Sequence, residues 1–199
     1  MAKDINKILN PEFIERIGET PSKETEIVWE STGKRNGVPY LTVKKVGSYT
    51  FSERLGTDSV AFILFDRKDD KVCIVKERKP PLDERLGTDI LLATAFGGSL
   101  DSEHTPEQIV AFEVEEEAGY KVGLDRVMYI DSVMVSTQSN QMCYLYLVDV
   151  TGLHEQDKKP ENELEAMAKT IWIDVDEVFA TNDWKCATIV GKAKYQRLM

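Results

Sequence analysis

The sequence predicts a mixed α/β sandwich. Strand-like apolar segments alternate with helical segments through the last two-thirds of the chain, a pattern typical of folds that pack helices against a sheet. The composition, with 42% hydrophobic and 30% charged residues, is that of a folded globular protein. A chain of 199 residues buries about two-thirds of its unfolded surface, which is enough to fold without disulfides.

The charge balance and the cysteines exclude several classes of protein. There are 25 Lys and Arg residues against 35 Asp and Glu, so the net charge of −10 would repel nucleic acid and anionic membranes. Cys73, Cys143 and Cys186 lie in apolar segments with no Cys-x-x-Cys pair, which predicts buried, reduced thiols. The first residues lack a signal-peptide core, and no apolar run reaches the length of a membrane span. These features predict a cytoplasmic protein.

The N-terminal third is expected to contain one helix and one pair of strands. Apolar residues at helical spacing predict a helix within residues 4–18. Strands are expected at 25–30 and 40–46, and Asn36-Gly37 between them is a hairpin signal.

A second hairpin is expected in the middle of the chain, where strands at 59–65 and 71–75 flank a charged turn. Residues 79–89 are rich in Pro, Gly and charge and are expected to form a loop. An apolar strand at 91–96 then ends at Gly97-Gly98.

Six residues of the chain occur twice. Glu53–Asp58 and Glu84–Asp89 have the same sequence, and each copy precedes an apolar strand. Because the flanking residues do not match, we expect a shared loop-to-strand geometry and no repeat architecture.

The clearest helix spans residues 105–118. Thr105 is its expected N-cap, Pro106 occupies the first helical position and Gln108 completes a capping box, while Gly119 is expected to end the helix. The rest of the chain is expected to contain strands at 127–135 and 142–150, a polar loop at 151–161, a strand at 170–174, a helical turn at 175–180 and a helix from 182.

Three glutamates lie on one face of this helix. Glu113, Glu116 and Glu117 are related as i, i+3 and i+4, which places them within an arc of about 100°. Carboxylates gathered in this way form a good site for Mg²⁺ or Mn²⁺, since both ions prefer hard oxygen ligands. By themselves, the three residues are more simply explained as a solvated acidic helix face.

The surrounding residues resemble the Nudix box, whose pattern is Gly-x5-Glu-x7-Arg-Glu-U-x-Glu-Glu-x-Gly-U with U apolar. Gly98 matches the first glycine, and the end of the pattern is matched in register by Glu113, Val114, Glu116, Glu117, Gly119 and Tyr120. Two positions depart from the pattern, because His104 stands where the first glutamate is expected and Phe112 where the arginine is expected. The resemblance implies a Nudix-type α/β/α sandwich with a mixed sheet and an N-terminal β extension.

The resemblance extends over about residues 25–199. Val75–Pro80 looks like the V-x-Q-x-R segment of ADP-ribose and nucleotide-sugar pyrophosphatases, and Glu161–Glu165 resembles a later acidic loop of that branch. In that register Glu77 replaces the Gln and Lys79 the Arg. The resemblance implies a substrate-binding set of Lys76, Arg78, Lys79, Ser139 and Gln141. The three basic residues are equally explained as solvated charges at a strand end.

The resemblance also implies a metal site. In the family, glutamates at the positions of Glu113 and Glu117 hold a divalent cation, with Glu116 assisting. A backbone carbonyl, here that of Gly97, often completes the coordination. The implied cofactor is Mg²⁺ (or Mn²⁺), and the implied reaction is the attack of water on a phosphorus of a nucleoside diphosphate joined to another group.

The general base of this branch is often a glutamate on a late loop, where Glu161 and Glu163 are both candidates. Their alternative interpretation is a solvated acidic loop. The family arginine hydrogen-bonds the metal-site glutamates, whereas Phe112 has no donor to offer. Loss of such support lowers metal affinity or activity by about 10- to 100-fold.

These features predict a Mg²⁺-dependent pyrophosphohydrolase that acts on ADP-ribose, a nucleotide sugar or a related nucleoside diphosphate derivative. The alternative is a catalytically impaired Nudix domain that binds a nucleotide or a protein partner without turnover. Residues 1–56 are expected to form a helix and β extension, and residues 57–199 the Nudix domain. Because the extension has apolar strands that need cover, we expect a homodimer built through it.

Overall fold

The structure is a computed structural model that describes residues 24–56, 58–100, 102–160 and 162–199. The helix expected within residues 4–18 lies outside these ranges. The chain forms two compact units. The first comprises Met1–Ser59, Ser99–Ser102 and Ser132–Cys143, and the second comprises Val60–Gly98, Glu103–Asp131 and Tyr144–Met199.

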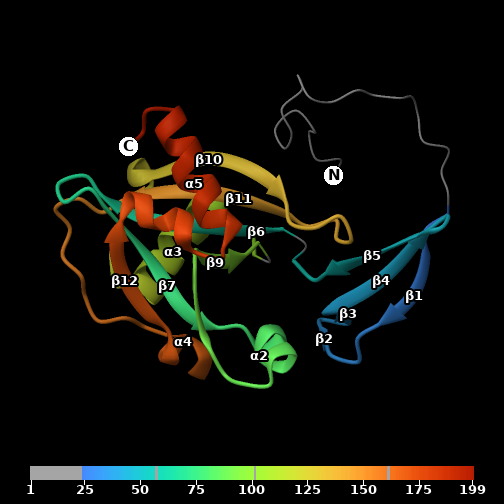
Figure 1. Cartoon of the computed structure of the whole chain (residues 1–199). Helices are drawn as coiled ribbons and strands as arrows, with labels where there is room; N and C mark the ends of the chain where they lie inside the picture. Colours follow the sequence, from blue (N-terminus) through green and yellow to red (C-terminus); the bar gives the residue numbers. More distant parts are fainter. Residues whose placement is uncertain (1–23, 57, 101, 161) are drawn as a thin grey trace. The chain divides into compact units, whose positions relative to one another are not determined.

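A three-stranded antiparallel sheet dominates the first unit. Its order is β1 (Glu26–Glu30), β4 (Leu41–Val46) and β5 (Tyr49–Arg54), as Figure 1 shows. The strands predicted at 25–30 and 40–46 therefore pair. Between them, β2 (Lys34–Arg35) and β3 (Val38–Pro39) form a short ladder. Asn36 and Gly37 close it with φ of 52° and 81°, the conformation of a type I′ turn.

A seven-stranded sheet carries the core. Its order is β10-β11-β6-β7-β12, with β8 also paired to β7 and β9 to β6. The predicted hairpin is confirmed, since β6 and β7 pair antiparallel. Every residue from Val60 to Phe65 is buried, as expected for a strand covered on both faces. The strands are β6 (Ser59–Asp66), β7 (Lys71–Arg78), β8 (Leu91–Thr94), β9 (Phe96–Ser99), β10 (Val127–Met134), β11 (Met142–Asp149) and β12 (Lys169–Asp174).

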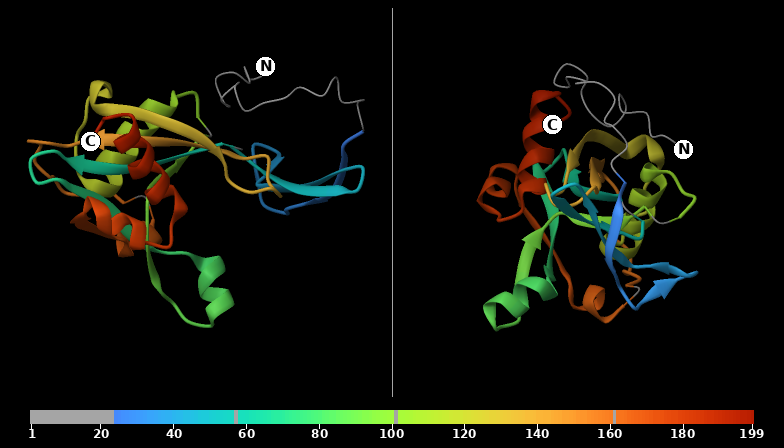
Figure 2. Two further views of the ribbon diagram at one scale, coloured as in Figure 1. Left: turned by 45° about the horizontal axis from the view of Figure 1, so that its top comes forward. Right: turned by 90° about the vertical axis from the view of Figure 1, so that its right-hand side faces the viewer.

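Two helices lie on opposite faces of this sheet, α3 (Pro106–Ala118) and α5 (Trp184–Tyr195), as Figures 1 and 2 show. Each buries one apolar stripe, formed in α3 by Ile109, Val110, Val114 and Ala118 and in α5 by Cys186, Ile189, Val190 and Ala193. The predicted α/β fold class, a sandwich of helix, sheet and helix, is confirmed. No helix among the described residues is long and apolar enough to cross a membrane.

The predicted signals at the ends of α3 are present. Thr105 Oγ1 accepts a hydrogen bond from the Gln108 backbone N–H at 3.3 Å, and Gln108 Oε1 accepts one from the Thr105 N–H at 2.9 Å. Gly119 ends the helix with φ of 76°. A Cβ there would collide with the carbonyl oxygen of Gln156, so only glycine fits this close approach.

The loop expected at 79–89 contains a helix, α2 (Pro80–Leu86), so that prediction is wrong. Pro80 and Pro81 have their φ angles fixed in the helical range at the first two positions, and Gly87 ends the helix with φ of 68°. The buried Asp83 carboxylate stabilises the turn by pairing with Arg78 at 2.9 Å and accepting the Ile90 N–H at 3.0 Å.

The single strand expected at 91–96 is two strands, β8 and β9, and the glycine pair lies inside β9 and not at a strand end. The break falls at Ala95, whose N–H donates to the carboxylate of the buried Asp183 at 2.9 Å. A side-chain acceptor from a distant segment therefore interrupts the strand. Three further elements complete the fold: η2 (Leu124–Arg126), α4 (Glu163–Met167) and η3 (Val175–Ala180).

All three cysteines are free and buried, as predicted. Burial raises the pKa of Cys73 and of Cys186 to about 12. Both thiols therefore stay protonated at neutral pH and are poor nucleophiles.

Candidate active site

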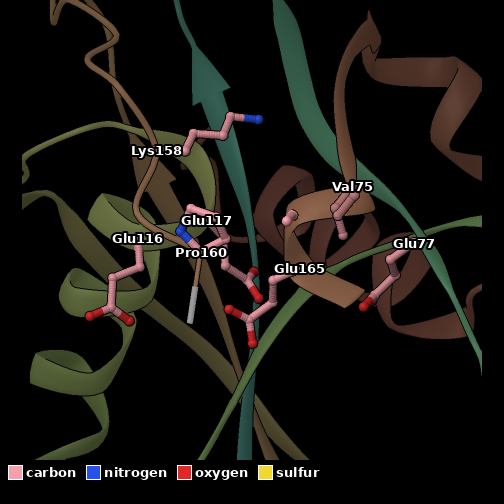
Figure 3. Close-up of a pocket in the computed structure, with 9 residues that line it drawn as sticks. Val75, Glu77, Glu116, Glu117, Lys158, Pro160 and Glu165 are labelled. Atoms are coloured by element: carbon pink, nitrogen blue, oxygen red, sulfur yellow. The ribbon is translucent and has the colours of Figure 1, made fainter. Parts of the chain in front are cut away.

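A cavity of about 100 Å³ in the second unit contains two of the α3 glutamates (Figure 3). Its walls come from β7, the last turn of α3, the segment before α4, and α4 itself. The lining residues are Val75, Glu77, Glu116, Glu117, Lys158, Pro160, Glu165, Ala166 and Ala168.

Glu117 is the most strongly perturbed carboxyl of this cavity. Its pKa is raised from 4.5 to about 8, chiefly by burial and then by the negative charges of Glu113, Glu77 and Glu165, while Lys79 opposes the rise. Without a cation, this carboxyl therefore keeps its proton at neutral pH. Figure 3 shows the carboxylates of Glu117 and Glu165 pointing toward one another, whereas Glu116 points away from them.

Glu113 lies against the glycine pair of β9. A Cβ built on Gly98 would collide with Glu113 Oε1, so the missing side chain makes the space that this carboxylate occupies. Gly97, the neighbouring residue, is exposed in β9. The Glu113 carboxylate therefore lies next to β9, the strand that contains Gly97, whose backbone carbonyl is expected to join the metal site.

Glu77 adds a carboxylate from β7. Its Oε1 accepts hydrogen bonds from Lys79 Nζ at 2.6 Å and from Thr94 Oγ1 at 2.9 Å. Lys79 therefore lies next to the acidic cavity. Arg78 instead pairs with Asp83 at 2.9 Å and Asp89 at 2.6 Å.

The segment before α4 is anchored to the end of α3. The Gln156 N–H donates to the Gly119 carbonyl at 2.8 Å, and the Lys159 N–H donates to the Glu116 carbonyl at 2.9 Å. These backbone bonds hold residues 156–160 as one wall of the cavity.

Glu165 enters the cavity from α4. Asn162 caps this short helix through its Oδ1, which accepts the N–H groups of Leu164 and Glu165 at 3.0 Å each. The Asn162 amide also donates to Glu165 Oε1 and so orients the carboxylate. Glu163, on the same helix, is exposed and does not line the cavity. Glu161 lies outside the described residues.

A family model of the NUDIX domain matches residues 56–189. The chain belongs to the Nudix hydrolase superfamily. No curated protein matches it in sequence. A solved structure titled "Crystal structure of ADP compounds hydrolase" is similar in fold, with a TM-score of 0.59 and 10% identity over 89% of this chain and 96% of that one.

Within this Nudix domain, the predicted substrate-binding residues do not lie together. Lys79 lies beside Glu77. Lys76 points to the opposite face of β7, where it lines a different, largely apolar groove with Leu92 and Ile171. This separation follows from the two-residue period of a strand, which places residue 76 opposite to residues 75 and 77.

Ser139 and Gln141 belong to the first compact unit, whereas the α3 glutamates belong to the second. Ser139 Oγ accepts the Gln141 N–H at 3.2 Å, and Gln141 Nε2 donates to Ser59 Oγ at 3.0 Å. These bonds stabilise the turn before β11.

The donor chemistry of the cavity suits a hard divalent cation. Glu117, Glu77 and Glu165 line it, Glu113 lies nearby, and all four offer carboxylate oxygens; the charges of the other three add to burial in raising the pKa of Glu117. As the side chains stand, no group of three or more Asp, Glu, His or Cys residues in the described part of the chain is placed to hold a metal ion. Assembly of the site therefore requires side-chain rotation, Glu116 being the residue turned furthest away in Figure 3.

Sequence reasoning missed Glu77 and Glu165 as members of the cavity. In the sequence, Glu77 stands out only as a replacement for glutamine, and Glu165 only as part of an acidic loop. The strand period was a usable signal for Glu77, because it lies on the same face as the buried Val75. No comparable local signal distinguishes Glu165 from Glu163.

Proposed function

We propose that this Nudix domain is a divalent-metal-dependent hydrolase that cleaves the diphosphate of a nucleoside diphosphate derivative, such as ADP-ribose or a nucleotide sugar. One observation carries the proposal. The cavity contains glutamates of the Nudix pattern together with the carboxylates of Glu77 and Glu165, and Lys79 lies beside it. The fold neighbour titled an ADP compounds hydrolase supports this substrate class.

Glu113 and Glu117 would hold the cation, Mg²⁺ or Mn²⁺, with Glu116 and the Gly97 carbonyl assisting. When bound, such an ion lowers the pKa of a water ligand and neutralises phosphoryl oxygens. The glycine beside Glu113 and the charge that surrounds Glu117 are the features of this chain that fit the ion.

Glu165 is the proposed general base. Water attacks one phosphorus of the diphosphate, the new P–O bond replaces the bridging P–O bond, and the water proton passes to the Glu165 carboxylate. Asn162 holds that carboxylate in place through the bond to Oε1. Glu163 is the less favoured alternative because it is exposed outside the cavity, and Glu161 remains a candidate outside the described residues.

Lys79 is the proposed contact for the substrate diphosphate. Its ammonium lies 2.6 Å from Glu77 Oε1, so a phosphate that enters the cavity meets a cation already oriented by this carboxylate. Arg78 is not proposed as a substrate contact, because it pairs with Asp83 and Asp89 and stabilises the α2 turn.

A substrate panel tests the proposal. ADP-ribose, UDP-glucose, NADH, capped RNA and 8-oxo-dGTP are each incubated with the full chain and Mg²⁺ or Mn²⁺, and the products are separated by anion exchange. We expect metal-dependent release of nucleoside monophosphate from at least one diphosphate, and its loss in Glu117→Gln. Absence of cleavage across the panel with both metals contradicts the proposal.

A second function is favoured by the two departures from the Nudix box. His104 and Phe112 replace a glutamate and an arginine, which suits a domain that binds a nucleotide or protein partner without turnover. Calorimetric titration with ADP-ribose distinguishes the two functions, because a binder retains a measurable Kd while no product forms.

We also infer a homodimer formed through the N-terminal extension, residues 1–56, with residues 57–199 as the Nudix domain. The first unit leaves five apolar side chains about half exposed: Ile27, Val28, Trp29, Tyr40 and Tyr49. An apolar surface of this kind is typical of an interface. We propose that a second copy of the same extension covers this surface. We also propose that the protein is cytoplasmic.

A further inference from the structure

The two departures from the Nudix box contact each other. The rings of His104 and Phe112 lie 5.0 Å apart between centroids and at 70°, an edge-to-face arrangement. Both residues belong to the second compact unit, and both are exposed, Phe112 at 47%. Two substitutions that lie eight residues apart in the sequence are therefore one contact in space.

The family pattern has a glutamate at the position of His104 and an arginine at that of Phe112. In this fold those two positions face each other, so the charged residues of the pattern would be neighbours. We propose that His104 and Phe112 are a coupled replacement of that charged pair, and that the aromatic contact positions Glu113 for cation binding. The second half of this statement rests on the proposed function, whereas the coupling itself does not.

The placement of α3 gives the contact its role. Phe112 and Glu113 are consecutive; Glu113 lies against strand β9, and Phe112 contacts the residue before the N-cap of the helix. Glu113 occupies the space beside Gly98, and Phe112 contacts His104, which precedes the Thr105 cap. Adjacent residues of α3 thus make the contact with His104 and the close approach to Gly98. In this proposal, loss of the ring contact frees the Phe112 side chain and leaves the neighbouring Glu113 carboxylate less fixed beside Gly98.

This coupling predicts that neither position can be returned to the family residue alone. Phe112→Arg removes the ring contact and places a guanidinium beside an imidazole. His104→Glu removes the same contact and adds a carboxylate to an already acidic site. The double variant His104→Glu/Phe112→Arg restores opposite charges at the two positions.

The test is a double-mutant cycle on the full chain. The wild type, the two single variants and the double variant are compared by urea unfolding in EDTA and by calorimetric titration with Mn²⁺ alone. Phe112→Tyr, which retains the ring, is the conservative variant. Leu124→Arg places an arginine on an equally exposed apolar residue of the same unit, at 51%, and is the matched control.

We expect the singles to be non-additive, with a coupling of about fivefold in the unfolding equilibrium constant. We expect each single to weaken Mn²⁺ binding by about tenfold, as the loss of a residue that positions a ligand does. The double variant and Phe112→Tyr should bind within twofold of the wild type, and Leu124→Arg should change neither reading.

Additive effects in the unfolding cycle overturn the coupling. If the unfolding effects are non-additive but both single variants bind Mn²⁺ as tightly as the wild type, the positioning role is overturned. If the wild type binds no Mn²⁺, the proposed function and the positioning role both fail, and the coupling is still decided by the unfolding cycle, which uses no metal.

Discussion

Replacing Glu117 with glutamine is expected to stabilise the metal-free protein at alkaline pH. Burial and the charges of Glu113, Glu77 and Glu165 raise the pKa of Glu117 from 4.5 to about 8. A carboxyl with a raised pKa favours the folded state while it is protonated and loses that contribution as the pH rises through the folded value. The wild type should therefore lose stability, relative to Glu117→Gln, between about pH 5 and pH 8.

The magnitude follows from the difference between the two pKa values. A tenfold change in proton binding is worth about 1.4 kcal/mol, so the full difference corresponds to an upper limit of about 5 kcal/mol. Side-chain rotation and water entry relieve part of this cost, and we expect about 2 kcal/mol at pH 8.5. For a domain of this size that is a rise of about 4–8 °C in Tm.

The assay is urea unfolding followed by circular dichroism, in EDTA at pH 5.0 and pH 8.5. Glu84→Gln, which neutralises an exposed glutamate of α2, is the matched control. Saturating Mg²⁺ should reverse the order, because a ligand that binds the folded wild type stabilises it and Glu117→Gln has lost a ligand. An equal gap between wild type and Glu117→Gln at both pH values, or equal stabilisation of both by Mg²⁺, would refute the reasoning.

Three further predictions concern the site and the extension. Glu165→Gln should lower kcat by about 100-fold or more with little change in KM, because a general base is lost. Glu163→Gln should leave kcat unchanged. Steady-state kinetics on the best substrate of the panel test both variants. Gly98→Ala should weaken Mn²⁺ binding by about tenfold or more in titration calorimetry, because the new Cβ displaces the Glu113 carboxylate. Gly191→Ala, whose Cβ meets open space, is the control for a generic glycine effect. Ile27→Asp/Trp29→Asp should convert a dimer into a monomer in sedimentation velocity, and a full-length wild type that is monomeric at micromolar concentration contradicts the dimer.

The repeated hexapeptide shows which parts of the fold the sequence could predict. In Glu53–Asp58 the first two residues end strand β5, whereas in Glu84–Asp89 the first three end helix α2. The expectation of one shared geometry was therefore wrong for the elements that precede the glycines, whereas a strand follows each copy, as expected. It was right for the glycines, since Gly56 and Gly87 both adopt left-handed φ, of 61° and 68°. Glycine turn chemistry is local, whereas the choice between strand and helix depends on partners supplied by the rest of the chain.

The aspartates of the two copies make the same point. Asp58 is buried and its carboxylate accepts the Met142 N–H at 3.1 Å, whereas Asp89 is exposed and pairs with Arg78 at 2.6 Å. Identical residues acquire different roles because the groups that they meet are distant in sequence. For the same reason Glu165, which enters the cavity from another helix, was not distinguishable from Glu163.

The charge of the cavity bears on both candidate functions. Four of its lining residues are glutamates and one is a lysine, Lys158, whose ammonium donates to Thr170 Oγ1 at 2.9 Å. Lys79, beside the cavity, is paired with Glu77. A diphosphate would bring further negative charge into this surrounding, so it needs a cation to enter with it. Clustered glutamates destabilise the folded protein at neutral pH, and without a metal ion they would also repel the phosphates of a nucleotide. This arrangement does not suit a protein that binds nucleotides without metal. The acidic cavity therefore favours a function in which a divalent ion and a diphosphate bind together.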